Sequence, residues 1–514
     1  MQSITDFVAA KCAKYAKREL LYDDSSKETL SYEMFALNVQ KAQNFFRDEI
    51  SEQSPLTFSV IAPNCPNYLY AVLGLLACEA VAVNLNPNLG DKELVERLRL
   101  AEVQVLVCSQ SYYNRLMIIL PQTTICKVFV LDDTSVKFNI VKQKDDQRVQ
   151  LNLCLPERSA FIQYTGGTSG TTKAAVIRHQ NVIENIKQLN NHFNKYILMN
   201  ELVVLVAFPF YHIFAVVFNF LFFLGNGGKI ILYQNMRDTA LIIDLLEQNK
   251  VNFTVGVNTW YKKLMQNPAF KRLDFSALRA CIAGGEYVPV STKIEWKELT
   301  GKLLSSGYGL TETSSLSIIS PLEAREDIMD SIGKPIESTE VRLLDEKDCW
   351  IEGLDRPGEL VLKGPQVFEG YYNNHEETEN AFYQGWFRTG DIAQRVTQDQ
   401  YKIVDRKKDM ISVSGNKVYP NEVEAVIVNL DGVLDVAVVG RASQKSGEEV
   451  VAFVSKNVRT ELSEEEIVVF CKNQLARFKV PKAVFFLDEL PKTPIGKTAR
   501  KVLRERLKMS HGDR

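Results

Sequence analysis

The sequence predicts an α/β protein with a large N-terminal domain of helix-covered parallel sheets, a β-rich subdomain and a small α+β C-terminal domain. Three observations lead to this prediction. Up to about residue 331, short apolar runs alternate with helical patterns. From 332 to 404, short strands stand among glycine and proline turns, and from 405 to 514 helical and strand patterns are mixed. Alternating β and α elements favour parallel sheets covered by helices.

The alternation begins in the first hundred residues. Apolar runs at 59–62, 81–84, 103–108 and 128–131 predict strands, and the patterns at 68–78 and 91–101 predict helices. A second series has strands at 202–208, 229–232 and 253–256, with an apolar helix after 208 and further helices at 239–248 and after 256. In such sheets ligands bind beyond the carboxyl ends of the strands.

The later part of the chain is organised differently. Strands are predicted at 340–344, 358–362 and 401–404, which form the β-rich subdomain of 332–404. Helices at 420–429 and 463–474 and strands at 436–439 and 450–454 form the C-terminal domain. We expect the domain boundary at Asp405, which gives domains of 1–404 and 405–514.

Composition excludes several classes of function. The 514 residues carry a net charge of −2, so no general electrostatic attraction to nucleic acid or anionic membrane is expected. The nine scattered cysteines fit a reduced, cytoplasmic compartment better than a disulfide framework. No signal peptide is apparent at the start, and the apolar stretch 202–224 contains Pro209, His212 and Asn219, so a buried strand and helix explain it better than a membrane span.

The most informative stretch is Tyr164 to Lys173, with the sequence YTGGTSGTTK. Glycines let a backbone lie close to a ligand, clustered N–H groups and hydroxyls donate to anionic oxygens, and the lysine adds a positive charge. The stretch therefore predicts a phosphate cradle. A flexible linker is the alternative, but the apolar run 160–164 before it reads as a buried strand and a helical pattern follows it.

Two common nucleotide motifs are excluded. A P-loop requires G-x-x-x-x-G-K-[ST], and the sequence that ends in Gly496, Lys497 and Thr498 has Pro491 at the first glycine position. A dinucleotide fingerprint that begins at Gly307 has Glu312 where the last glycine is required.

Four further clusters carry candidate chemistry. In Ser306 to Thr313 (SGYGLTET), Tyr308 can stack on a base and Glu312 is a hard oxygen ligand for Mg²⁺; a turn with a helix-capping glutamate is the alternative. In Gly385 to Asp391 (GWFRTGD), the aspartate can accept hydrogen bonds from ribose hydroxyls, although this is a common turn composition.

The remaining two clusters are less specific by themselves. Val404 to Met410 (VDRKKDM) is a dense charge run that is usually a solvated hairpin. Pro491 to Lys497 (PKTPIGK) places Lys497 at a turn shaped by glycine and proline, where most lysines are only solvated.

In this order, the five clusters resemble the adenylate-forming superfamily, which contains acyl-CoA synthetases, luciferases and peptide-synthetase adenylation domains. The likeness extends over about 59–507. Within the superfamily the chain most resembles bacterial long-chain fatty acyl-CoA synthetases. This likeness is carried by YTGGT at 164–168, PFYHIF at 209–214, VGVNT at 255–259, AGGE at 283–286 and the segment from 385 to 408.

The resemblance implies a two-step reaction with ATP and CoA as co-substrates and Mg²⁺ as cofactor. A fatty-acid carboxylate attacks the ATP α-phosphate to give an acyl-adenylate and pyrophosphate, and the CoA thiol then displaces AMP. Charge builds up on phosphate oxygens in the first step, which favours catalysis by a metal, a lysine and fixed donors.

The resemblance also assigns roles by motif position. Glu312 would hold Mg²⁺, Thr311 a phosphate, and Lys497 would bridge the carboxylate and the α-phosphate. His212 and Phe214 would gate the acyl pocket, with Val257 and Asn258 along its wall; a core histidine is the alternative for His212. The nucleotide would be bound by Thr165, Gly166, Gly167, Thr168, Ser169, Lys173, Gly284, Gly285, Glu286, Tyr308, Asp391 and Arg406.

The small domain would be mobile. It would rotate about Asp405 after adenylation, remove Lys497 and bring the loop of Ser412 to Gly415 to the pantetheine channel, because pyrophosphate must leave before the thiol enters. Two residues depart from the family pattern. Thr172 stands where proline or a small apolar residue is frequent, and Ala174 replaces the glycine after the cradle lysine.

The sequence leaves two alternatives to a fatty acyl-CoA synthetase. One is an adenylating enzyme that passes its acyl group to a carrier protein or another acceptor. The other is a catalytically weak acyl-binding or uptake protein with the same fold. Peripheral membrane contact and a homodimer are left open, and no nucleic-acid partner is expected.

Overall fold

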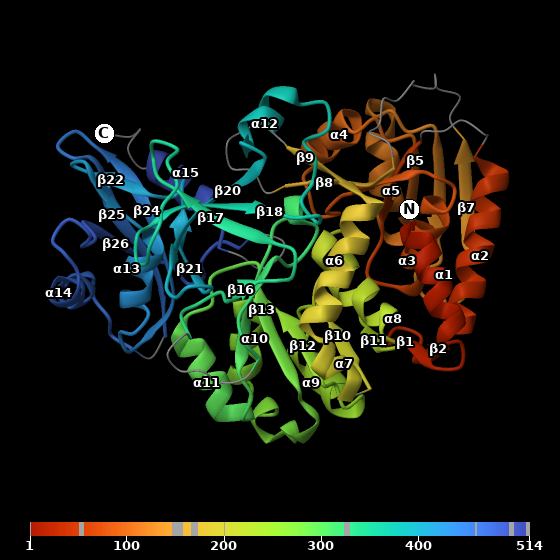
Figure 1. Cartoon of the computed structure of the whole chain (residues 1–514), viewed down its shortest axis with the longest axis horizontal. Coiled ribbons are helices and arrows are strands. Elements are labelled where there is room, and N and C mark those ends of the chain that lie inside the picture. The colour runs from red at the N-terminus through yellow and green to blue at the C-terminus, as the bar shows by residue number, and fades with distance from the viewer. Residues whose placement is uncertain are drawn as a thin grey trace.

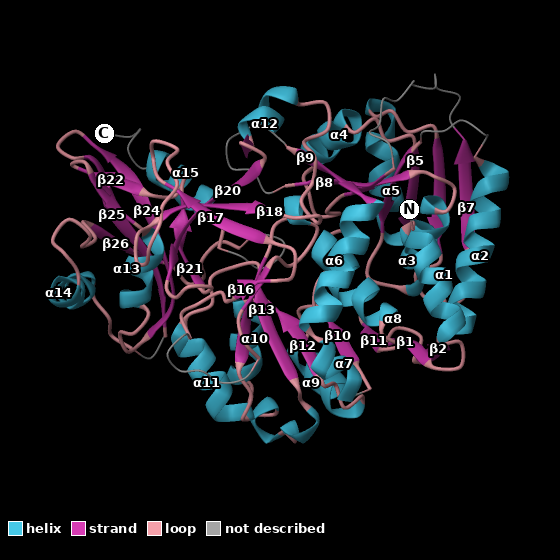
Figure 2. Ribbon diagram, viewed as in Figure 1, coloured by secondary structure: helices cyan, strands magenta, loops and turns pink. Residues whose placement is uncertain are grey.

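In the computed structural model, residues 2–50, 56–145, 158–165, 173–199, 201–322, 329–457, 460–492 and 498–509 are described. They form a seven-stranded, a nine-stranded and two five-stranded sheets (Figures 1 and 2). The first two sheets are mainly parallel and covered by helices, the third is antiparallel, and the fourth belongs to the C-terminal part. The predicted fold class is confirmed.

The seven-stranded sheet has the order β7-β6-β5-β3-β4-β8-β9. Its inner pairs are parallel, and only β7 and β9 run antiparallel to their neighbours. The strands are β3 (Thr57–Ile61), β4 (Val81–Asn84), β5 (Val105–Ser109), β6 (Lys127–Leu131), β7 (Ile140–Asp145), β8 (Ser159–Tyr164) and β9 (Ala174–Arg178).

Both faces of this sheet are buried. Alternate residues of β5 enter different hydrophobic cores: Val105 and Val107 join the largest core, and Leu106 and Cys108 join a second one. This alternation follows from the two-residue period of a strand. Helices α2 (Tyr32–Glu49) and α3 (Pro66–Leu76) supply residues to the first core, and α4 (Asp91–Leu100) and α5 (Gln110–Ile119) supply the second.

The nine-stranded sheet has the order β16-β15-β14-β13-β12-β10-β11-β1-β2. The six neighbouring strands β14, β13, β12, β10, β11 and β1 are parallel, and β2, β15 and β16 are antiparallel additions at the two edges. The strands are β1 (Glu19–Asp23), β2 (Glu28–Ser31), β10 (Val203–Val206), β11 (Lys229–Leu232), β12 (Phe253–Gly256), β13 (Ala280–Gly284), β14 (Leu304–Tyr308), β15 (Ile318–Ile319) and β16 (Lys334–Pro335).

The helices associated with this sheet include one of an unexpected type. The apolar helix predicted after 208 is a π-helix, η2 (Ala215–Phe222), a rare form that is frequent at functional sites. It is followed by α8 (Phe223–Gly225). The others are α1 (Ile4–Lys14), α6 (His179–His192), α7 (Asn194–Met199), α9 (Thr239–Gln248), α10 (Asn258–Gln266) and α11 (Val290–Thr300).

The β-rich part is an antiparallel sheet of β17 (Glu340–Leu344), β18 (Gly358–Lys363), β19 (Phe382–Tyr383), β20 (Trp386–Arg395) and β21 (Tyr401–Arg406), with helix α12 (His375–Asn380) beside it. Its last strand includes Asp405. The next sheet starts at Ile411, so residues 407–410 connect the two sheets.

The C-terminal sheet contains β22 (Ile411–Val413), β23 (Asn416–Val418), β24 (Val433–Ser443), β25 (Gly447–Lys456) and β26 (Ala483–Phe486), with helices α13 (Pro420–Ile427), α14 (Glu464–Gln474) and α15 (Arg500–Met509). These elements, blue in Figure 1, lie at the opposite end of the molecule from β3 to β7. They have hydrophobic cores of their own.

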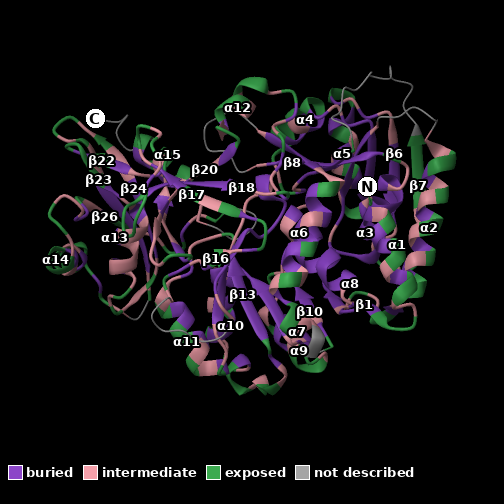
Figure 3. Cartoon of the chain, viewed as in Figure 1, coloured by how far each residue is buried: buried purple, intermediate pink, exposed green. Residues whose placement is uncertain are grey.

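Figure 3 shows that burial concentrates on the strands, while the outer faces of the helices are exposed. In the described part of the chain, no helix is both long and apolar enough to cross a membrane. The cysteines described there are all free.

Candidate active site

A cavity of about 1470 Å³ lies between the large N-terminal part and the C-terminal part. Its walls include residues that follow β8, β13 and β14, which is where ligands bind in parallel sheets. The cavity brings together many of the side chains predicted from the sequence: Thr165, Lys173, His212, Gly284, Gly285, Glu286, Tyr308, Thr311, Glu312, Asp391 and Arg406.

The predicted phosphate cradle connects two antiparallel strands. Thr165 N donates to Lys173 O (3.0 Å), and this bond closes the base of a hairpin between β8 and β9. The strand before the cradle was expected, but the helical pattern does not follow directly: strand β9 comes first, because its apolar side chains are buried in the sheet. Gly166, Gly167, Thr168 and Ser169 lie outside the described residues.

Lys173 contacts two groups on the cavity wall. Its Nζ lies 2.5 Å from Glu377 Oε2 and 5.3 Å from the centre of the Tyr371 ring. The Tyr371 hydroxyl in turn donates to Glu312 Oε1 (2.9 Å). A lysine, an aromatic ring and two carboxylates therefore line one wall.

Glu312 lies in a short 3₁₀-helix, η5 (Thr311–Thr313), directly after β14 and its connecting loop. Its side chain is buried, and this burial raises the pKa of Glu312. Among the described residues, no arginine or lysine forms an ion pair with it. A desolvated carboxylate that lacks a paired cation suits a hard divalent ion.

The backbone after Glu312 is strained. Ser314 has φ 62° and ψ −55°, and Ser315 N donates to Thr313 O (2.7 Å), which is the geometry of a classic γ-turn. The loop also requires Gly309, because a Cβ atom there would lie 1.7 Å from Ser315 O. Strain of this kind is frequent at ligand sites.

Tyr308, Asp391 and Arg406 form a chain of contacts. The Tyr308 hydroxyl donates to Asp391 Oδ2 (2.7 Å), and Arg406 Nε lies 3.3 Å from Asp391 Oδ1. Asp391 and Arg406 are direct cross-strand partners in β20 and β21. Burial raises the pKa of Tyr308 well above its ordinary value, so its hydroxyl remains a donor at neutral pH.

The glycines after β13 let two backbones approach closely. A Cβ at Gly284 would lie 2.6 Å from Gly307 O, and Gly285 has φ +82°. Glu286, which follows, accepts a hydrogen bond at Oε1 from Thr259 N in α10 (3.1 Å).

The aromatic wall lies before η2. His212 Nδ1 accepts from Phe214 N (3.3 Å), and the Phe208 and Phe214 rings lie 5.0 Å apart. Phe208, His212, Phe214 and Asn258 line the cavity, whereas Val257 is not among its lining residues. His212 therefore precedes the apolar helix and faces the cavity.

The C-terminal part contributes the opposite wall. Lys492 and Thr498 line the cavity, and Lys492 Nζ donates to Thr498 Oγ1 (3.0 Å). Lys497 lies outside the described residues. Gly415 forms the turn between β22 and β23 with φ +79° and is not among the lining residues of the cavity.

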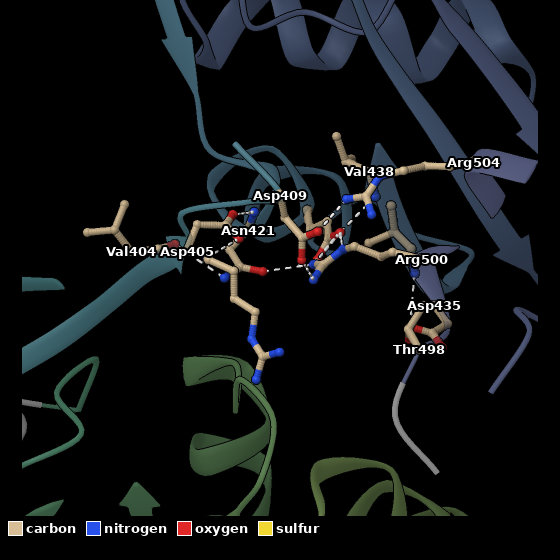
Figure 4. Close-up of polar contacts among 12 residues, drawn as sticks. Val404, Asp405, Asp409, Asn421, Asp435, Val438, Thr498, Arg500 and Arg504 are labelled. Atoms are coloured by element: carbon tan, nitrogen blue, oxygen red, sulfur yellow. Dashed lines mark hydrogen bonds and ion pairs between the residues drawn. The ribbon is translucent and has the colours of Figure 1, made fainter. Parts of the chain in front are cut away.

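A partly buried network joins this wall to the end of β21 (Figure 4). Asp405 Oδ2 accepts from Asn421 N (2.7 Å), and Asn421 Nδ2 donates to Val404 O (3.2 Å). Arg500 Nη2 donates to Asn421 Oδ1 (2.9 Å) and to both Glu424 oxygens (2.8 Å each). Burial raises the pKa of Asp405 to about 6.

Sequence reasoning missed several residues of these clusters: Tyr371, Glu377, Asn421, Glu424 and Arg500. Tyr371 lies in the sequence GYYNN at 370–374, whose glycine and asparagines mark it as a turn beside other motifs. Nothing in the local sequence indicates that its hydroxyl reaches Glu312.

Residues 8–372 match the model of the AMP-binding enzyme family, and residues 422–497 match that of the AMP-binding enzyme C-terminal domain. The chain is 34% identical to a long-chain-fatty-acid–CoA ligase of Escherichia coli O6:H1, over 98% of this chain and 94% of the relative. It is 36% identical to one of Yersinia pestis, over 87% and 84%.

The fold has solved counterparts. The ATP-bound structure of MatB from Rhodopseudomonas palustris superposes with a TM-score of 0.87 at 24% identity and covers 99% of both chains. Lys173 and Glu312 lie within the first matched range, and Lys492 of the opposite cavity wall lies within the second. On this agreement of sequence and architecture, the chain belongs to the AMP-binding enzyme family of the adenylate-forming superfamily.

Proposed function

We propose that the protein activates medium- or long-chain fatty acids to acyl-CoA through an acyl-adenylate, with release of pyrophosphate and AMP. The observation that carries the proposal is the convergence of Lys173, Glu312 and Asp391 with an aromatic wall in one cavity. The names of the bacterial relatives favour fatty acids as the substrate class.

In the first half-reaction, a carboxylate oxygen of the acid attacks the α-phosphorus of ATP and the bond to pyrophosphate breaks. Lys173, Thr165, Thr311 and the loop 166–169 bind the phosphates, and Lys497 bridges the carboxylate and the α-phosphate. Glycines 284 and 285, Glu286 and Tyr308 frame the adenine, and Asp391 with Arg406 holds the ribose. The Tyr308–Asp391 contact of 2.7 Å supports a preformed ribose acceptor.

The residues around Glu312 fit a magnesium ion. Its buried carboxylate offers oxygen ligands. A single carboxylate suits Mg²⁺, which takes one or two carboxylates and completes its shell with phosphates and water. When bound, Mg²⁺ would neutralise charge on the phosphates; Glu312 would hold it, and Tyr371 would orient that carboxylate.

In the second half-reaction, the CoA thiol attacks the acyl carbonyl and AMP leaves. His212 and Phe214, which line the cavity, gate the acyl chain in this proposal. We propose that the small domain rotates about Asp405 between the two steps, so that the turn at Gly415 replaces Lys497 at the cavity.

The cellular setting is part of the proposal. We propose a cytoplasmic location, where ATP and CoA are available. Because long-chain acids partition into lipid, the proposal includes peripheral contact with a membrane surface, which vesicle sedimentation tests. Light scattering tests for a homodimer.

The experiment is an assay of ATP- and CoA-dependent AMP release across carboxylic acids from acetate to oleate, with aryl acids included. We expect the highest kcat/KM with a medium- or long-chain acid and faster AMP release when CoA is present. A preference for aryl acids would contradict the fatty-acid assignment. AMP release that CoA does not accelerate would indicate another acyl acceptor.

A further inference from the structure

The ion pair between Lys173 and Glu377 has no role in the reaction described above. The two side chains come from different elements, since Lys173 precedes β9 and Glu377 belongs to α12. Their charged atoms lie 2.5 Å apart, and each side chain retains about a quarter of its exposure (22% and 27%). Both residues line the cavity.

Glu377 is held at this position by its own turn. Asn374 Oδ1 accepts from Glu377 N (3.1 Å), Thr378 Oγ1 donates to Asn374 O (2.7 Å), and Tyr371 N donates to Thr378 Oγ1 (2.9 Å). The same Tyr371 places its ring beside Lys173. The carboxylate is therefore built into the wall where a ligand of Lys173 would bind.

A carboxylate and a phosphate compete for the same ammonium group. Both offer anionic oxygens at hydrogen-bond distance, and a polyphosphate near Lys173 would also be repelled by the Glu377 charge. We propose that Glu377 is a specificity-determining residue for polyphosphate: it occupies Lys173 in the empty site, weakens binding of ATP and pyrophosphate, and so favours release of pyrophosphate. The inference rests on the proposed function only in placing polyphosphate at Lys173.

The contribution of this pair to folding is small, because exposed and half-exposed ion pairs add little stability. Two other glutamates of α12 provide matched controls. Glu376 and Glu379 are exposed and do not line the cavity. Neutralising either one changes the net charge of the same helix by the same amount without freeing Lys173.

The test is calorimetric titration of the full-length protein with MgATP and, separately, with inorganic pyrophosphate. For Glu377→Gln we expect Kd to fall about 3- to 10-fold for both probes, which is the range for losing a competing charge at a partly exposed site. For Glu379→Gln we expect wild-type Kd. The thermal midpoints of both variants should stay within about 2 °C of the wild type.

An unchanged or higher Kd in Glu377→Gln would overturn the inference, and a higher value would instead make Glu377 part of the nucleotide or metal site. An equal decrease in Glu379→Gln would also overturn it, because the effect would then be one of net charge. The titration requires no turnover, so its result would hold even if the protein did not activate fatty acids.

Discussion

The polar cluster at Lys173 and the polar cluster at Asp405 line the same cavity but differ in how their charges are satisfied. Lys173 has one carboxylate partner, Glu377, at a site about a quarter exposed. Asp405 is fully buried, and Arg500 nearby donates to both Asn421 and Glu424. A ligand can replace Glu377 as the partner of Lys173. In the second cluster, the polar groups satisfy one another within the protein.

This difference separates two kinds of residue. Substitutions in the first cluster should change the binding and activation of substrate while the fold stays intact. Substitutions in the second should change stability and the arrangement of the small domain.

Lys497→Ala should reduce adenylation at least about 1000-fold, because the charge on the reacting phosphate and carboxylate is no longer bridged. Thioester formation from supplied acyl-adenylate should stay within a few-fold of wild type. The two half-reactions are measured separately, by pyrophosphate formation and by acyl-CoA formation. Equal losses in both would contradict the assignment of Lys497 to one step.

Glu312→Gln should lower adenylation about 100- to 1000-fold, since a neutral amide holds a divalent ion poorly. The thermal midpoint should not fall, because burial raises the pKa of Glu312 and disfavours its charged form. Magnesium titration of activity checks the cause: the variant should require more Mg²⁺. An unchanged magnesium requirement would argue against Glu312 as the ligand.

Asn421→Ala removes the contacts of its side chain with Val404 and Arg500. We expect about a 10-fold loss of adenylation and a loss of about 1–2 kcal/mol in the free energy of unfolding. Asn429→Ala is the matched control, because its amide donates to Ala425 O, one turn earlier, at an exposed site. If both variants adenylate equally well, the network at Asp405 does not position the small domain.

Asp405 should give the smallest effect on activity, and its titration should instead appear as a dependence of stability on pH. Burial raises the pKa of Asp405 to about 6, so the folded state holds a proton that the unfolded state releases near pH 4. Stability should therefore fall as pH rises from about 4 to about 6 and then level off, by at most about 3 kcal/mol at about 1.4 kcal/mol per pH unit.

Urea unfolding of wild type and Asp405→Asn between pH 4.5 and 7.5 measures this effect. The difference between the two proteins matters, because half-buried His179 and His192, each with a pKa lowered by desolvation to about 4, add an opposite slope to both. Identical slopes in the two proteins would show that Asp405 does not titrate in this range.

Much of the fold could be predicted because periodicity reports burial. Strands β4, β11, β12 and β17 and helix α9 have the bounds that their apolar patterns indicate. The π-helix could not be predicted, since an all-apolar run such as Ala215 to Phe222 has the same composition in an α- or a π-helix. Strand β9 was missed because Ala174 to Arg178 run directly into helix α6, so that only the helical pattern was recognised after the cradle.

The site was predictable where function requires unusual local sequence. Glycines beside Lys173, Glu312 and Asp391 mark loops that approach a ligand. Tyr371 and Glu377 lie in an ordinary turn and helix, and their importance comes from contacts with residues far away in the chain, such as the hydroxyl of Tyr371 with Glu312, 59 positions apart. Such contacts exist only in the folded protein.

The central claim is that the cavity adenylates a fatty acid before CoA takes part. The most direct test is exchange of labelled pyrophosphate into ATP by the wild-type protein, with Mg²⁺ present and CoA omitted. The account predicts exchange that depends on the added medium- or long-chain acid. Absence of exchange with every acid, or exchange that requires CoA, would contradict it.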